Sequence, residues 1–187
     1  MAKAVLPKRR NRLQTKAKIL EAAQEAFADI GYSMSGTRDI AARAGVTSPM
    51  LLHYFDSKAG LFEAALIESM RNYGFFDRPK ERFGTDLMDA LSNATIEIRT
   101  PALIVLSTGD PETRAITSRV AKEHAVRPLA KWLGPPDAYA RAVHISMLAI
   151  AYVLFTRQVP LLALGSQTDR KVKRSMAEAI QSVVDAV

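Results

Sequence analysis

Apolar residues recur at helical spacing along almost the whole chain, and no window alternates strictly between apolar and polar residues. This pattern predicts an all-α protein of about nine helices. Proline, glycine and N-cap residues set the expected limits of each helix. The expected helices span residues 12–30, 37–44, 48–54, 58–77, 85–99, 101–107, 111–133, 137–156 and 169–187.

The two longest N-terminal patterns each predict one buried face. In the first helix the inward stripe consists of Leu13, Ile19, Leu20, Ala23, Phe27 and Ile30, and Gly31 is a natural stop. In the helix from Lys58 to about Asp77 it consists of Leu61, Phe62, Ala65, Leu66 and Met70. At 1.5 Å per residue the latter helix would reach roughly 30 Å, long enough to join two domains.

Residues 37–55, TRDIAARAGVTSPMLLHYF, fit a helix-turn-helix, in which two short helices meet at a tight turn. Gly45 permits the turn, and Val46 would fill the angle between the helices. Ile40, Ala41 and Leu51 would face inward with Val46. The remaining polar and apolar side chains of the second helix are then available to a ligand.

The positive charge of the N-terminal third is consistent with a polyanionic partner. The protein carries 26 basic and 19 acidic residues, a net charge of +7. Residues 1–60 hold 10 basic and 5 acidic side chains, so most of the excess lies in the first third. A basic stretch next to a helix-turn-helix is typical of nucleic-acid binding.

This stretch and its flanks resemble the TetR family of dimeric bacterial transcriptional regulators. The matching positions are Lys18-Ile-Leu-Glu-Ala-Ala, Phe27, Gly31-Tyr32, Arg38-Asp-Ile-Ala, Ala44-Gly-Val, Leu51, Tyr54-Phe55, Ser57-Lys58 and Leu61-Phe62. The resemblance implies that the second short helix enters the major groove of double-stranded DNA. It also implies a basic disordered arm (1–9), a helix-turn-helix domain (10–57) and an effector-binding and dimerisation domain (58–187).

By the same resemblance, Arg38, Ser48 and Pro49 would face base edges, where an arginine can pair with guanine. Phosphate contacts would come from Thr37, His53, Tyr54 and Lys58. Two positions depart from the family pattern: Met50 replaces a small or hydroxyl residue and Leu52 an aromatic hydroxyl residue, which favours apolar contact with thymine methyl groups. The candidate DNA-binding residues are Thr37, Arg38, Thr47, Ser48, Pro49, Met50, Leu52, His53, Tyr54 and Lys58.

The basic segment from Lys3 to Lys18 has two interpretations. It either follows phosphates or the adjacent minor groove, as basic arms do, or it is a solvated disordered tail.

The C-terminal half offers candidates for a small-molecule pocket and for a dimer interface. The pocket candidates are Phe75, Phe76, Met88, His124, Trp132 and Met147, although each alone is as typical of core or interface packing. The interface candidates are Val143, Met147, Ile150, Leu154, Met176, Ile180 and Val183. They would form a four-helix interface in a two-fold homodimer, and the alternative is a core within one chain.

These observations favour a cytoplasmic bacterial regulator, most simply a repressor released from a palindromic operator by a largely apolar effector. The alternative is an apolar-ligand carrier with nonspecific DNA affinity. An enzyme is not expected, because no nucleophile and base, cofactor loop or metal constellation has suitable spacing. No cofactor or metal is expected either: the chain has no cysteine, and His53, His124 and His144 are not spaced as helical ligand pairs. The apolar stretch 145–164 is interrupted by polar residues and proline, so we expect a buried helix there rather than a membrane span.

Overall fold

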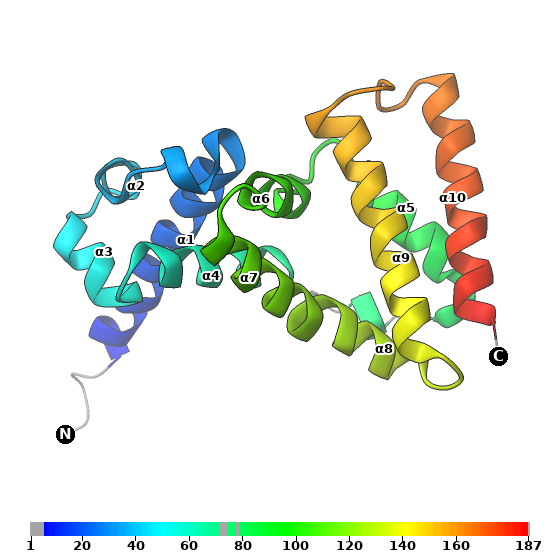
Figure 1. The fold of residues 1–187 in the computed structure, drawn as a ribbon, viewed down its shortest axis with the longest axis horizontal. Coiled ribbons are helices and arrows are strands. Elements are labelled where there is room, and N and C mark those ends of the chain that lie inside the picture. The colour runs from blue at the N-terminus through cyan, green and yellow to red at the C-terminus, as the bar shows by residue number, and fades with distance from the viewer. Residues whose placement is uncertain (1–5, 72–74, 78, 187) are drawn as a thin grey trace. The chain divides into compact units, whose positions relative to one another are not determined.

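The computed structural model describes residues 6–71, 75–77 and 79–186, and every regular element in these ranges is helical (Figure 1). The all-α prediction is therefore confirmed. The α-helices are α1 (Leu6–Met34), α2 (Thr37–Arg43), α3 (Ser48–Phe55), α4 (Lys58–Ser69), α5 (Phe83–Ser92), α6 (Thr100–Ser107), α7 (Pro111–Ala121), α8 (Arg127–Leu133), α9 (Ala138–Val153) and α10 (Gln167–Asp185). Short 3₁₀ turns are η1 (Phe75–Asp77) and η2 (Lys80–Arg82), and π-helical turns are η3 (Lys122–Val126) and η4 (Leu154–Gln158).

The chain divides into two units. Unit 1 comprises Met1–Ser69 and Ala102–Ser118, and unit 2 comprises Met70–Pro101 and Arg119–Val187. Unit 1 therefore holds α1 to α4 with most of α6 and α7, and unit 2 holds α5, α8, α9 and α10. The chain passes from one unit to the other three times.

The core of unit 1 forms where α1 packs against the three helices that follow it. The Phe27 and Phe62 rings meet edge to face at 5.4 Å, and Ile19, Ile40 and Leu51 are fully buried around them. Edge-to-face packing is a favoured arrangement for aromatic pairs. This aromatic contact ties the first helix to the fourth.

Most of the predicted inward positions of unit 1 are buried. In α1 the buried part of the predicted stripe runs from Ile19 to Phe27, and Leu13 and Ile30, 62% and 52% exposed, were wrongly assigned to it. Periodicity gives the face of a helix but not how far along it neighbouring helices reach. Gly31 interrupts the helical backbone with φ of 77°, as expected of a helix stop.

Two predicted helices end earlier than expected. The fourth ends at Ser69, whose hydroxyl donates to the Leu66 carbonyl, instead of reaching Asp77; residues 72–74 of that prediction lie outside the described residues. Helix α5 ends at Ser92 instead of residue 99, because the Asn93 carboxamide oxygen accepts hydrogen bonds from the Thr95 backbone N–H and hydroxyl. Such local side-chain bonds compete with the helical hydrogen-bond ladder.

The expected helix from Pro111 to Leu133 is present as α7, η3 and α8. Its π-helical turn ends two residues before Pro128, which has no N–H and whose ring would collide with the carbonyl four residues back in a regular α-helix. The wider turn accommodates the proline without ending the helix.

Helix α9 and η4 together, Ala138–Gln158, have a mean hydropathy of 1.5 and are long enough to cross a membrane. This is the one stretch of that kind in the described part of the chain. In unit 2, Ala142, Ile145 and Val153 of α9 are buried against neighbouring helices. Only 28% of the apolar stretch is buried, however, so the helix that the sequence predicted to be buried is covered on one side only.

Helices α5 and α10 approach most closely at Gly84. A Cβ atom there would lie 2.2 Å from the Ala177 carbonyl oxygen and 2.9 Å from the Gln181 backbone nitrogen. The Gly84 N–H also donates to the Gln181 side-chain oxygen at 3.0 Å. Only glycine therefore fits at this crossing.

We predict that Gly84→Ala lowers the free energy of unfolding of unit 2 by about 1–3 kcal/mol, because the methyl group must push two helices apart. In an open helix position the same change stabilises by about 1 kcal/mol, so the sign of the effect is diagnostic. Trp132, the only tryptophan, lies in unit 2, so its fluorescence during urea unfolding is the measurement.

Thr85→Ala is the matched control, because Thr85 is the next residue of α5 and is exposed. Its effect should stay within about 0.5 kcal/mol. Equal unfolding midpoints for Gly84→Ala and the unmodified protein would contradict the close approach.

Candidate nucleic-acid interface

Helices α2 and α3 form the predicted helix-turn-helix, with both helices within one residue of their expected limits. Gly45 takes φ of 67° between them, a backbone conformation in which a side chain would be strained. The turn closes through a 2.9 Å hydrogen bond from the Val46 N–H to the Ala41 carbonyl. Thr47 then caps α3, because its hydroxyl accepts from the Met50 N–H at 3.3 Å.

Helix α3 has one buried face and one exposed face. Leu51 and Phe55 are 0% and 6% exposed and pack into unit 1, while Ile40 anchors α2 in the same core. On the other side, Met50 is 45% and Leu52 39% exposed. An eight-residue helix thus presents apolar side chains to solvent, which is typical of a surface that contacts another molecule.

The structure brings the ten candidate DNA-binding residues onto neighbouring elements of unit 1. Six of them are exposed: Arg38, Thr47, Pro49, Met50, Leu52 and His53. Four are half-buried: Thr37, Ser48, Tyr54 and Lys58. They lie on α2, on the turn, on α3 and at the first position of α4. Local folding therefore gathers the candidates without any need for unit 2.

The N-terminal turns of α1 add basic residues beside the end of α3. The Arg12 guanidinium lies 5.7 Å from the Tyr54 ring, and the Lys16 ammonium lies 5.7 Å from the Phe55 ring. Cations at this distance from an aromatic face are attracted to it. The sequence analysis placed basic residues near the helix-turn-helix but did not identify these two contacts.

Helix α1 begins earlier than expected. It starts at Leu6, so residues 6–9 of the predicted disordered arm are helical, and residues 1–5 lie outside the described residues. Pro7, the second residue of α1, is the signal that the sequence offered, because proline favours the first turn of a helix. The helical start fixes the spacing of Arg12 and Lys16 along one rigid element.

Lys58 already has partners within unit 1. Its ammonium lies 4.3 Å above the Tyr32 ring, and the Tyr32 hydroxyl is 3.5 Å from a Glu112 carboxylate oxygen. Burial lowers the pKa of Lys58, and the nearby Asp110 carboxylate opposes that shift. Burial, with the Glu112 and Asp110 charges, raises the pKa of Tyr32. Lys58 is therefore held in place rather than freely solvated.

Asp110 anchors the segment that brings Glu112 to this cluster. Its carboxylate accepts from the Thr113 backbone N–H at 2.9 Å and from the Thr113 hydroxyl at 3.1 Å. The backbone hydrogen bond from Thr113 is the main reason that the pKa of Asp110 is lowered. The predicted helix start at Asp110 and Pro111 is thus present, with the carboxylate as its cap.

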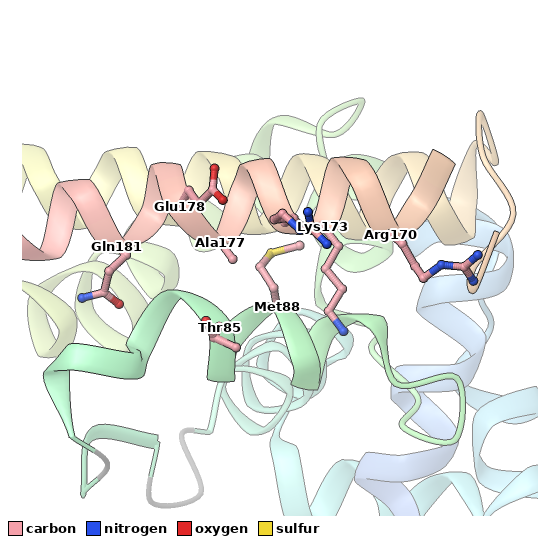
Figure 2. Close-up of a pocket in the computed structure, with 8 residues that line it drawn as sticks. Thr85, Met88, Arg170, Lys173, Ala177, Glu178 and Gln181 are labelled. Atoms are coloured by element: carbon pink, nitrogen blue, oxygen red, sulfur yellow. The ribbon is translucent and has the colours of Figure 1, made fainter. Parts of the chain in front are cut away.

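The candidate pocket residues are distributed over unit 2. The Phe76 and Trp132 rings stack at 5.7 Å, and the Trp132 indole N–H donates to the Phe76 carbonyl at 3.0 Å. Met88 is fully buried between α5 and α10, where it lines a groove (Figure 2). His124 is exposed on η3 and Met147 is 64% exposed on α9, so neither joins the aromatic pair. The side chain of Phe75 lies outside the described residues.

The candidate dimer-interface residues divide by exposure. Ile180 is fully buried in the core of unit 2, so its assignment to an interface was wrong. The sequence analysis assigned an apolar stripe of α10 to a partner chain, but α10 packs against α5 and α9 of the same chain. Met147 is exposed, and the other candidates are half-buried: Val143, Ile150, Leu154, Met176 and Val183.

Comparison with known proteins agrees with this geometry. The family described as "Bacterial regulatory proteins, tetR family" matches residues 19–65, from within α1 through α2 and α3 into α4. The TetR-family match therefore covers 47 of the 187 residues, the part of the chain that holds the helix-turn-helix. A curated relative, the HTH-type transcriptional activator FasR of Mycolicibacterium smegmatis, is 41% identical over 68 residues. This alignment covers 35% of the present chain and 31% of the relative, so the chain spans about a third of that protein's length.

Solved structures share the TetR-family fold over most of the chain. One is a TetR-family transcriptional regulator from Rhodococcus sp., with a TM-score of 0.74 and 18% identity, covering 92% of this chain and 100% of that one. Another is NalD, the secondary repressor of the MexAB-OprM multidrug efflux pump in Pseudomonas aeruginosa. It has a TM-score of 0.64 and 19% identity, with coverage of 89% and 96%. At these identities the likeness concerns the fold.

We predict that Thr47→Ala in this helix-turn-helix weakens the start of α3, because the Met50 N–H loses its partner. Loss of such a cap costs about 1 kcal/mol, which corresponds to about fivefold faster amide hydrogen exchange in α3. Thr47→Ser keeps the hydroxyl and should exchange like the unmodified protein. Equal acceleration in both variants would contradict the capping role.

Proposed function

We propose that this chain is a sequence-specific DNA-binding regulator of transcription of the TetR family. The observation that carries the proposal is the exposed face of α3, where Pro49, Met50, Leu52 and His53 face solvent while Leu51 and Phe55 hold the helix in the core. A helix of this kind enters the major groove in helix-turn-helix proteins. The match to the TetR family covers this same region.

The candidate residues then take two roles. Arg38, Ser48 and Pro49 read base edges, and exposed Met50 and Leu52 favour thymine methyl groups over hydrogen-bonding edges. The other five set the register through phosphates or the backbone near them, and they are Thr37, Thr47, His53, Tyr54 and Lys58. Lys58 reaches DNA from a fixed position, because its ammonium is already packed on Tyr32.

The proposed active form is a homodimer on a palindromic operator. Two-fold symmetry places two copies of α3 in successive major grooves, about 34–36 Å apart. Support comes from α9, on which Tyr139 and Met147 are 49% and 64% exposed at helical spacing, with Val143 half-buried between them. An apolar helix face of this size is best explained by a partner helix.

We predict that Met147→Glu raises the dimer dissociation constant by about tenfold or more, because a carboxylate would be buried without a partner. Sedimentation equilibrium over a concentration series is the measurement. Lys131→Glu introduces the same residue at an exposed position on another helix, α8, and should leave the dissociation constant unchanged. A dimer that is indifferent to Met147→Glu would place the interface elsewhere.

We further propose that the regulator is a repressor that a largely apolar effector releases from DNA. A bound dimer blocks promoter access without further contacts, which makes repression the simplest output; NalD, with the same fold, is described as a repressor. An effector that favours a conformation unsuited to the operator lowers the affinity for DNA. By linkage, DNA lowers the affinity for the effector by the same factor.

Sequence reading by Arg38 is tested by selection of bound sequences from random duplex DNA at about 0.15 M salt, where loose phosphate attraction is already reduced. We expect a palindrome to be enriched. Arg38→Ala should lose about 1–3 kcal/mol of discrimination at one base pair of each half-site.

Arg43→Ala is the matched control for Arg38→Ala. Both arginines lie on α2, but the Arg43 guanidinium is 3.6 Å from the Asp29 carboxylate and is not a candidate contact. It should leave the selected sequence unchanged. Equal effects of the two variants, or binding without any enriched sequence, would refute specific reading and favour the carrier alternative.

A further inference from the structure

A groove of about 460 Å³ lies in unit 2 between α5 and α10. Its apolar lining includes Ala177 and the fully buried Met88, and its α10 side carries Arg170, Lys173 and Arg174. Figure 2 shows Met88 directed from α5 toward α10, and Lys173 extended from α10 toward α5. The groove therefore combines an apolar lining with a cationic side.

The positive charge on this part of α10 is not needed for helix stability. The first eight residues of α10 contain four basic side chains, Lys171 in addition to the three in the groove. Cations near a helix N-terminus oppose the helix dipole and repel one another. Asp169, the acidic residue in this stretch, is buried and accepts from the Tyr152 hydroxyl at 2.7 Å, so it does not face the groove cations as a free counterion.

The three groove cations differ in their partners. The Lys173 ammonium forms a 2.7 Å ion pair with Asp89, and an Arg170 nitrogen donates to the Gly165 carbonyl at 2.6 Å. Arg174 has no hydrogen bond or ion pair to the part of the chain that the structure describes. Glu178 lines the same groove, but in Figure 2 its carboxylate points away from α5. An exposed guanidinium without a partner in the described part of the chain thus lines the groove.

We propose that this groove binds an organic anion with an apolar body. The apolar body lies on Ala177 and along the aliphatic part of Lys173, since long basic side chains cover apolar surface with their stems. The anionic group, a carboxylate or phosphate, accepts hydrogen bonds from Arg174, with Arg170 contributing charge. A guanidinium suits such a group because its N–H donors match two oxygens at once.

Hexyl phosphate is a suitable probe, and isothermal titration calorimetry of the 187-residue chain without DNA is the measurement. We expect saturable binding that Arg174→Gln weakens about tenfold, the usual effect of losing one hydrogen bond to a charged group. Inorganic phosphate and hexanol, which each keep one half of the probe, should both bind at least about tenfold more weakly.

Lys171→Gln is the matched control, because it removes the same charge from an exposed neighbour on α10 that does not line the groove. It should leave the affinity for hexyl phosphate unchanged. Equal weakening by Lys171→Gln and Arg174→Gln would overturn the proposal in favour of diffuse charge attraction. Absence of saturable binding, or inorganic phosphate as strong as hexyl phosphate, would also overturn it. None of these outcomes depends on the proposed regulatory function.

Discussion

Helix α3 has only eight residues, and a helix that short does not form stably by itself in water. Its conformation depends on the burial of Leu51 and Phe55, so the side chains on the opposite face are not needed to stabilise the helix. The fully buried side chains of α1 and α2, Ile19 and Ile40, complete the core in which those two residues sit. The core of unit 1 therefore holds α3 in place, while Met50 and Leu52 remain exposed and take no part in that core.

In unit 2, the side chains of Arg141 and Arg157 donate hydrogen bonds to backbone carbonyls at the ends of helices. The Arg141 guanidinium donates to the Val184 carbonyl at 3.2 Å and also to the Gly134 carbonyl. The Arg157 guanidinium donates to the Leu91 and Asn93 carbonyls, both at 2.9 Å. The last carbonyls of a helix have no partner within it, and a cation there also interacts favourably with the helix dipole. From α9 and η4, these residues fasten the ends of α10 and α5, the two helices that enclose the cationic groove.

The sequence was most informative where local chemistry decides the structure. Gly45 and Thr47 act within a few residues of their own position, so the helix-turn-helix could be predicted from spacing alone, whereas the DNA contacts follow from the family resemblance and stay predictions. The end of α5 could not, because it also depends on Arg157, more than sixty residues later. Ile180 was misassigned for the same reason: an amphipathic stripe shows that a face is buried, but not whether the covering helix belongs to the same chain.

The connection between the two units differs from the single long helix that the sequence suggested. Helix α4 ends at Ser69, and the chain crosses between the units after residues 69, 101 and 118. The segment from residue 102 to 118, both of whose ends lead into unit 2, brings Glu112 to Tyr32, and Tyr32 packs under Lys58. Lys58, which we propose to contact a DNA phosphate, is therefore linked through Tyr32 to Glu112 in this segment. The segment continues into unit 2 at both of its ends. Binding of a ligand to unit 2 would be coupled to binding of DNA to unit 1 if this segment prefers one position when the ligand is bound and another when DNA is bound. The ligand would then change the affinity for DNA by the same factor by which DNA changes the affinity for the ligand.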